Sequence, residues 1–422
     1  MLRAYSQLDF LAPKNSATRR HEHHRDFAEE LRAFREFGTE TRETTATVAD
    51  GSAIPVFVNE FWTAKQRAAH SLHEISYRAC FKPQLPRFFI ERLTAPGDVV
   101  YDPFMGRGTT LLEAALLGRV PAGCDVNPLS VVLVKPRLNP PTQAEVERRL
   151  GEINFSYDAE IWEDLLAFYH PTTLRQITAL KNYFIERELD AVDEWIRMVA
   201  VNRLTGHSKG FFSVYTLPPN QAVSVKSQLR INERRNQTPD QRDVPAIIAK
   251  KSKQLLGDLD SQRAALGEVG AKTKLITGGC AHTSSIADES VALVVTSPPF
   301  LDVVDYAGDN WLRCWFVGLD AKTIKITVPK KIDVWKEAMT GVFRELSRVL
   351  KVGGHVAFEV GEVRAGKVRL EEAVLECGAE VGLRPALVMI NDQEFTKTAN
   401  CWGVANNARG TNTNRIVLFE KR

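Results

Sequence analysis

The stretch that decides the fold is VVYDPFMGRGTTLLEAALLGRVPAGCDVNP, residues 99–128. A short apolar run leads into a turn that contains Gly106 and Gly108, and a helix-forming run that stops at Gly118 follows. A second apolar run then ends at Asp125. The pattern predicts a strand, a glycine turn, a helix and a second strand, which together make half of a βαβ unit in a parallel sheet.

The turn and the second strand end indicate a ligand site. Gly106 and Gly108 let the backbone approach a ligand closely, and we expect Thr109 and Thr110 to cap the helix that follows. Asp125 stands at the next strand end, where a carboxylate binds ribose hydroxyls in units of this kind. A glycine turn followed by this acid predicts a cofactor that contains adenosine.

The turn also narrows the choice of cofactor. The dinucleotide fingerprint GxGxxG is absent, since the turn reads DPFMGRGTT, and there is no Walker lysine. Neither NAD nor ATP fits such a turn well. A cofactor with one ribose, no phosphates and an amino-acid tail fits better, which indicates S-adenosylmethionine.

A second motif lies far along the chain, in VVTSPPF at residues 294–300. A strand that ends on two prolines has no N–H with which to extend its ladder. It therefore ends by holding a hydroxyl, a stiff pair of carbonyls and an aromatic ring at its carboxyl tip.

Together, DPFMGRGTT, the strand end CDVNP and TSPPF resemble the amino-methyltransferases of DNA, which methylate exocyclic amines. In that family an (S/T)SPP(Y/F) tetrad is typical of N4-cytosine enzymes, and (D/N)PPY is typical of N6-adenine enzymes. The resemblance covers roughly residues 62–135 and 270–422, and the order of the two motifs is one of several that the family shows.

The resemblance implies roles for individual residues. Asp102, Phe104, Gly106, Gly108 and Thr109 match the cofactor loop, and Asp125 matches the acid that holds the ribose. Lys82, with Pro83, more loosely resembles the segment that meets the cofactor's carboxylate, and Cys280 stands where the family often has an Asp near the adenine. The catalytic tetrad corresponds to Ser297, Pro298, Pro299 and Phe300.

The chemistry of the family explains the tetrad. The lone pair of cytosine's exocyclic amine is delocalised into the ring, so the amine is a poor nucleophile. Hydrogen bonds to Ser297 and to the carbonyl of Pro298 would favour a pyramidal nitrogen, and Phe300 would stack on the flipped base. The resemblance thus implies direct, in-line methyl transfer to give N4-methylcytosine in double-stranded DNA. The sequence argues against carbon methylation, because that chemistry needs a thiolate, usually placed after a proline, and no cysteine here follows one.

Further apolar runs complete the expected sheet. Residues 274–278, 291–296, 355–363, 384–390 and 414–421 read as strands, and residues 333–354 read as an amphipathic helix with a glycine stop. With the first two strands this predicts an α/β fold, a doubly wound, seven-stranded, Rossmann-like methyltransferase sheet. We assign 1–61 to an N-terminal extension with an exposed linker, 62–135 and 271–422 to the catalytic domain, and 136–270 to a mainly helical insertion.

The insertion is the candidate for DNA target recognition. From Arg203 to Lys253 there are ten Lys or Arg residues against three acids, interleaved with Asn, Gln and Ser. Cations suit phosphates and amides suit base edges, although a solvated helix face is the alternative reading of the same run. The residues that we expect to contact DNA are Arg230, Arg234 and Arg235.

Composition sets the remaining expectations. Six cysteines without a CxxC pair indicate reduced thiols, and no stretch reads as a signal peptide or a membrane span, so we expect a cytoplasmic protein. We interpret the cluster at residues 21–24 as a helix face and expect no metal site. The expected partners are double-stranded DNA and a restriction endonuclease of a restriction-modification system. The alternatives are N6-adenine methylation, an RNA substrate, or an inactive nucleic-acid-binding protein on this fold.

Overall fold

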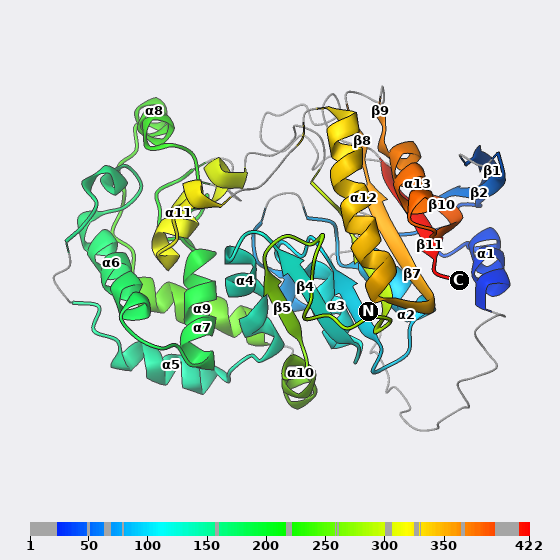
Figure 1. The fold of residues 1–422 in the computed structure, drawn as a ribbon. Coiled ribbons are helices and arrows are strands. Elements are labelled where there is room, and N and C mark those ends of the chain that lie inside the picture. The colour runs from blue at the N-terminus through cyan, green and yellow to red at the C-terminus, as the bar shows by residue number, and fades with distance from the viewer. Residues whose placement is uncertain are drawn as a thin grey trace.

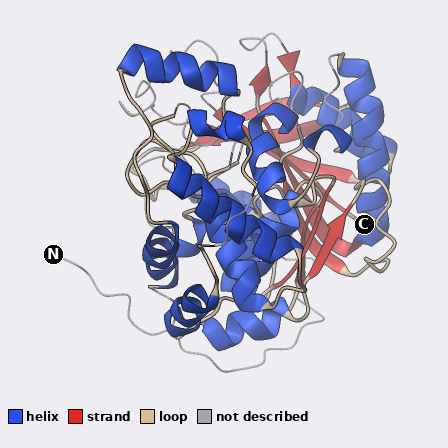
Figure 2. Ribbon diagram, turned by 90° about the vertical axis from the view of Figure 1, so that its left-hand side faces the viewer, coloured by secondary structure: helices blue, strands red, loops and turns tan. Residues whose placement is uncertain are grey.

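The computed structural model of the chain shows one large mixed sheet with helices on both sides (Figures 1 and 2). The residues that it describes are 23–48, 51–62, 69–77, 80–156, 160–216, 222–257, 259, 261–299, 306–324, 329, 331–363, 368–392 and 413–422.

The sheet has nine strands, in the order β1-β2-β10-β11-β7-β6-β3-β4-β5. Strands β5, β4, β3, β6 and β7 run parallel, and β11 is antiparallel to its neighbours β7 and β10. The strand bounds are β1 Arg42–Thr47, β2 Ala53–Asn59, β3 Val99–Asp102, β4 Val120–Asp125, β5 Lys274–Thr277, β6 Val291–Thr296, β7 Leu350–Val360, β10 Arg384–Asp392 and β11 Thr413–Glu420, with β8 Glu362–Val363 and β9 Val368–Arg369 in a separate pair.

All seven strands expected from sequence are present, in a doubly wound arrangement that reverses its order at β3. The expectation of an exposed linker before residue 61 was wrong. Strand β2 pairs in parallel with β10, and β1 pairs with β2 at the edge of the sheet. The polar and largely exposed side chains of β1 are those of an edge strand, and such strands are hard to tell from a linker by sequence.

The helix bounds are α1 His23–Ala33, α2 Gln84–Leu93, α3 Thr109–Leu116, α4 Leu129–Leu138, α5 Gln143–Glu152, α6 Pro171–Ile185, α7 Ala191–Val201, α8 Val225–Arg235, α9 Val244–Leu256, α10 Arg263–Gly270, α11 Tyr306–Val317, α12 Ile332–Val349 and α13 Leu370–Glu380, with 3₁₀ turns η1 Ser71–His73, η2 Glu163–Ala167 and η3 Ala321–Thr323.

Alternate side chains of the central strands face two different cores. Val294 of β6 packs in the cluster that includes α12 and α13, whereas its neighbours Leu293 and Val295 pack with α1 and α2. Because successive side chains of a strand point to opposite faces, a strand buried on both sides reads as one continuous apolar run. This is why VALVVT is apolar throughout.

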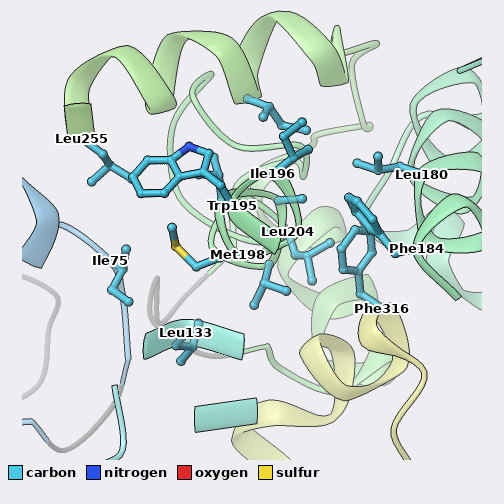
Figure 3. Close-up of a cluster of buried hydrophobic side chains, with 14 of the residues drawn as sticks. Ile75, Leu133, Leu180, Phe184, Trp195, Ile196, Met198, Leu204, Leu255 and Phe316 are labelled. Atoms are coloured by element: carbon cyan, nitrogen blue, oxygen red, sulfur yellow. The ribbon is translucent and has the colours of Figure 1, made fainter. Parts of the chain in front are cut away.

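The residues expected to form the insertion carry the helices from α5 to α10. The expected boundary at residue 136 falls inside α4. The helices share one core with the sheet region, as Figure 3 shows: Leu133 of α4 and Phe316 of α11 pack in the same cluster as Trp195 of α7. The insertion is therefore continuous with the catalytic region through its hydrophobic core.

Candidate active site

The glycine turn after β3 is held in a conformation that depends on its glycines. Gly106 and Gly108 have positive φ angles of 47° and 73°, which side chains with a Cβ rarely adopt. A Cβ on Gly108 would also lie 2.4 Å from Cγ2 of Val134 in α4. The turn thus needs a glycine at this position for its shape and for close packing on the next helix.

The helix that follows the turn begins differently from the sequence prediction. Gly108, in the left-handed conformation, is the N-cap of α3, with no side-chain hydrogen bond. Thr109 and Thr110 lie inside the helix, so the prediction that they cap it was wrong. The Thr110 hydroxyl instead donates to the carbonyl of Val295 at 3.0 Å, and Thr109 accepts from Arg107 Nε at 3.2 Å.

Asp102 joins the glycine turn to the strand that carries the tetrad. Its carboxyl is only 1% exposed and accepts from the Phe104 N–H at 3.0 Å and the Thr296 hydroxyl at 2.6 Å. Burial raises the pKa of Asp102 to about 7, although hydrogen bonds from Thr296, Phe104 and Thr110 oppose this. Asp102 therefore links the glycine turn, through Phe104, to the end of β6, through Thr296.

Asp125 lies at the carboxyl end of β4, directly beside the turn. Its two oxygens accept from the backbone N–H groups of Gly106 and Asn127, each at 2.8 Å. Burial raises the pKa of Asp125, and these backbone hydrogen bonds oppose the shift. The carboxyl is partly exposed and each oxygen has a second lone pair, so this acid suits the hydroxyl groups of a ribose.

The remaining residues predicted to bind the cofactor are Phe104, Lys82 and Cys280. Phe104 is partly buried against the core on the α12 side of the sheet. Lys82 is exposed, and its carbonyl accepts from Leu85 N–H in the first turn of α2. Cys280 follows β5 and packs in the apolar cluster that includes Cys124, where burial raises the pKa of its thiol.

The tetrad starts where β6 ends, at Thr296, on the same sheet edge as the glycine turn. Ser297 and Pro299 are partly exposed and Pro298 is buried, and Phe300 lies outside the described residues. Trp335 of α12, which is fully buried, donates from its indole N–H to the carbonyl of Pro299 at 3.0 Å. This bond fixes the orientation of the Pro-Pro segment.

A buried carboxyl that the sequence reading missed lies beside the tetrad. Glu359, near the carboxyl end of β7, is hydrogen-bonded to the Ser297 side chain and accepts from Asn414 Nδ2 at 2.9 Å. It is 5% exposed, and burial raises its pKa while both hydrogen bonds lower it. A glutamate inside the apolar strand HVAFEV was the one signal in the sequence that could have identified it.

The strands bring the two motifs together. Tyr101 of β3 pairs with Val294 of β6, and β6 is flanked on its other side by β7. The carboxyl ends of the three strands therefore carry the glycine turn, the tetrad and Glu359 side by side. Open α/β sheets bind ligands at this edge, beside the point where the strand order reverses.

The predicted DNA-contacting arginines are exposed on α8, at one end of the helical region (Figure 1). The guanidinium of Arg235 lies 3.7 Å from the ring centroid of Tyr215. Beside this pair is a polar hollow of about 440 Å³, which Lys209, Gln237 and Arg242 help to line. The arginines thus flank a surface rich in hydrogen-bonding groups.

Two further expectations concern groups outside the site. The cluster at residues 21–24 lies outside the described side chains, and elsewhere in the described chain no three His, Cys, Asp or Glu residues come together as metal ligands. None of the described helices is long and apolar enough to cross a membrane.

Comparison with known proteins supports the reading of the motifs. The family model described as DNA methylase matches residues 13–134. The Type II methyltransferase M.MvaI of Kocuria varians is 25% identical over 57% of this chain and 55% of its own length. M.BsoBI of Geobacillus stearothermophilus is 23% identical over 60% and 54%, and M.MjaII of Methanocaldococcus jannaschii is 34% identical over 18% and 14%.

The chain thus spans about half the length of M.MvaI and M.BsoBI. The family-model match includes the glycine turn and the strand end at Asp125, two of the three motifs that carried the resemblance, and the third, TSPPF, lies outside it. The comparisons therefore support the resemblance of this chain to the DNA amino-methyltransferases.

Proposed function

We propose that the protein transfers a methyl group from S-adenosylmethionine to an exocyclic amine of a base in double-stranded DNA. The observation that carries the proposal is the hydrogen bond between Thr296 and Asp102. It ties the strand end of the tetrad to the strand end of the cofactor turn, so that a donor bound on one and a base held by the other would meet.

The residues of the turn fit the proposed cofactor. Asp125 offers a partly exposed carboxyl for ribose hydroxyls, and the turn at Gly106 presents backbone without a side chain. A Cβ on Gly279, after the neighbouring strand β5, would meet nothing within 4 Å, so that strand end is open. When bound, the sulfonium supplies an electrophilic methyl group.

The chain's own task is to orient the amine. The Pro298 carbonyl and the Ser297 oxygen would each accept from the amine, and Trp335 keeps the segment rigid through Pro299. Positioning of this kind can supply most of a rate enhancement, since effective molarities reach about 10⁵–10⁸ M.

The SPPF form of the tetrad gives a reason to favour cytosine as the target base, since (S/T)SPP(Y/F) is typical of N4-cytosine enzymes in the family that the chain resembles. A neutral Glu359 carboxyl would donate to the Ser297 oxygen; burial favours this neutral form, and the hydrogen bonds with Ser297 and Asn414 oppose it. The Ser297 proton would then point to the ring nitrogen beside the amine, which is N3 in cytosine and N1 in adenine, while the remaining lone pair of the hydroxyl accepts from the amine. We therefore propose N4-methylcytosine as the product, and N6-methyladenine is the competing outcome.

The insertion completes the proposal. We assign residues 136–270 to target recognition, with α8 on the DNA backbone, and we infer that the target base is flipped out of the helix to reach Ser297. We propose a role in restriction-modification with a cognate endonuclease as partner, which the Type II names of the relatives support. We also propose that the protein acts in the cytoplasm.

The test is methyl transfer from tritium-labelled S-adenosylmethionine to duplex DNA, followed by digestion to nucleosides and mass spectrometry. We expect N4-methyldeoxycytidine from the wild type and much less of it from Ser297→Ala. Methyladenosine alone would overturn the choice of base. No transfer to DNA by a protein that binds both ligands would favour the inactive binding protein.

A further inference from the structure

Residues 71–76 lie between the cofactor turn and the helical insertion, and they are bonded to both. The segment begins with the turn η1 and contains Ile75, which is buried in the shared core (Figure 3). None of these residues belongs to the motifs that identified the site.

On the cofactor side, two arginines hold the segment. Arg107, from the middle of the glycine turn, donates to the carbonyls of Ile75 at 2.9 Å and His73 at 3.4 Å. Arg137 of α4 is 1% exposed and donates to the carbonyls of Leu72 at 3.3 Å and of Arg107 itself. Both the side chain and the backbone of Arg107 are thus fixed to this segment.

A buried pair adds a third tie on this side. His73 Nε2 lies 2.7 Å from Oε1 of Glu113 in α3, the helix that starts at the turn. Burial raises the pKa of Glu113 to about 7 and lowers that of His73, so the buried site disfavours the charged form of both partners. Arg87 of α2 faces the other oxygen of Glu113 at 3.6 Å.

On the other side, the same segment is bonded to α9 and α7 of the insertion and to α11 of the catalytic region. The Ser71 hydroxyl donates to the carbonyl of Leu255 in α9 at 2.8 Å, and Glu74 pairs with Lys251 of α9 at 3.0 Å. Ser76 donates its N–H to Asn202, which ends α7, and its carbonyl accepts from Arg313 of α11 at 3.1 Å.

We propose that residues 71–76 couple the insertion to the cofactor turn, with Arg107 as the positioning residue that transmits the coupling. The inference rests on the proposed function, since it takes DNA as the ligand of the insertion and S-adenosylmethionine as the ligand of the turn. DNA that orders the insertion restricts the motion of α9 and α7. Through the bonds of Ser71, Glu74 and Ser76, it also restricts the carbonyl groups to which Arg107 donates.

Coupling of this kind is reciprocal. DNA raises the affinity for the cofactor by the same factor by which the cofactor raises the affinity for DNA. Typical couplings between sites are about 5- to 150-fold. A purely structural brace would stabilise the fold without making either affinity depend on the other ligand.

The experiment measures S-adenosylhomocysteine binding by calorimetry, with and without sheared plasmid DNA. The test variant is Ser71→Ala with Glu74→Gln, which removes the Ser71 hydrogen bond and the charge of the Glu74 ion pair with α9 and leaves the carbonyls that Arg107 contacts. Glu74 is 60% exposed, which favours folding of the variant. The control is Glu376→Gln, which removes the ion pair with Lys336 between α12 and α13.

We expect DNA to tighten binding to the wild type and to the control by the same factor. In the double variant this factor should fall by about 3- to 10-fold, as the loss of one hydrogen bond and one ion pair implies, while binding without DNA is unchanged. Arg107→Lys, which keeps the charge but loses the fork, should weaken binding in both conditions.

Several outcomes would overturn the inference. One is a wild type that binds both ligands independently, and another is a double variant that keeps the full factor. A third is loss of binding without DNA in the double variant, with the Arg107→Lys protein unaffected. A wild type that binds no S-adenosylhomocysteine at all would instead remove the proposed function, on which the inference rests.

Discussion

Glu359 gives the tetrad a dependence on pH that Ser297 alone would not have. If the neutral carboxyl orients the Ser297 hydroxyl, turnover should fall as pH rises through the raised pKa of Glu359. Glu359→Gln imitates the neutral acid, because its amide donates to Ser297 and its oxygen still accepts from Asn414. We expect this variant to keep turnover within a few-fold and to lose the decline at high pH, as measured by kcat between pH 5 and 9.

Ser297→Ala is the control for this prediction. It should reduce turnover at every pH while leaving S-adenosylhomocysteine binding close to that of the wild type. A Glu359→Gln protein that is inactive, or that declines with pH as the wild type does, would contradict the role of a neutral Glu359.

Asp102 predicts a pH dependence of stability. The single proton of the Thr110 hydroxyl is already donated to the carbonyl of Val295. A protonated Asp102 carboxyl can therefore donate to the Thr110 oxygen, whereas an ionised one cannot. An acid whose pKa rises from 3.8 to about 7 on folding is most stabilising below its unfolded pKa. That stability is lost as pH rises toward the folded value, by up to about 1.4 kcal/mol per pH unit in the window.

Asp102→Asn does not titrate, so the comparison isolates this group. We expect the wild type to lose free energy of unfolding relative to the variant between pH 4 and pH 7, as measured by urea denaturation. If the wild type gains stability over the variant as pH rises, the carboxylate is the favoured form and the assignment fails.

Local motifs explain which site residues the sequence could reveal. Asp125 ends an apolar strand, Ser297 directly follows one and Gly106 lies in the turn after one, so a short stretch of sequence is enough to place each of them. Glu359 and Trp335 reach the tetrad only through the fold, 62 and 38 residues after Ser297 by their numbers. A glutamate within an apolar strand is a signal of a special role for Glu359, but no local pattern assigns either residue to the tetrad.

At the scale of elements, the errors share a physical cause. The capping threonines were misplaced because Gly108 ends the turn in a left-handed conformation, and propensity alone does not show this. The edge strand β1 was missed because its side chains face solvent. By contrast, the sequence TQAE at residues 142–145 has the pattern of a capping box, and Thr142 and Glu145 form one at the start of α5, since both partners lie within one helical turn.

Helix α8 carries the prediction about DNA binding. Its arginines 230, 234 and 235 are exposed, so replacing all three by Gln should weaken binding with little effect on folding. The slope of log affinity against log salt should decrease in magnitude by about 0.9 for each phosphate that the variant no longer neutralises. Lys272→Gln, which removes an exposed charge after α10, should leave the slope unchanged. An unaltered slope in the triple variant would show that α8 does not contact DNA phosphates and is a solvent-exposed helix face.

At the scale of the whole molecule, the shared core predicts cooperative unfolding. Leu133, Trp195 and Phe316 belong to one cluster that spans the sheet side and the insertion. We therefore expect tryptophan fluorescence and far-ultraviolet circular dichroism to report one coincident transition in urea. Thr142→Ala, within the insertion, should shift this single midpoint, at a cost of about 1 kcal/mol. Two separate transitions would show that the insertion is an independent domain.

Several neighbouring strands of the sheet are far apart in sequence, and this affects the order in which the chain folds as it is synthesised. Thr296 meets Asp102 across 194 residues, and Asn391 accepts from the N–H of Phe61 across 330. Strands β2 and β3 therefore leave the ribosome long before their neighbours β10 and β6 exist. The helices from α5 to α10 make contacts that are closer in sequence, and local contacts form sooner. Pulsed hydrogen exchange during refolding should protect these helices before β2 and β6. Simultaneous protection would show that the sheet forms together with the helices. If the sheet forms later, its apolar strands stay exposed and prone to aggregation until β10 and β11 have been synthesised.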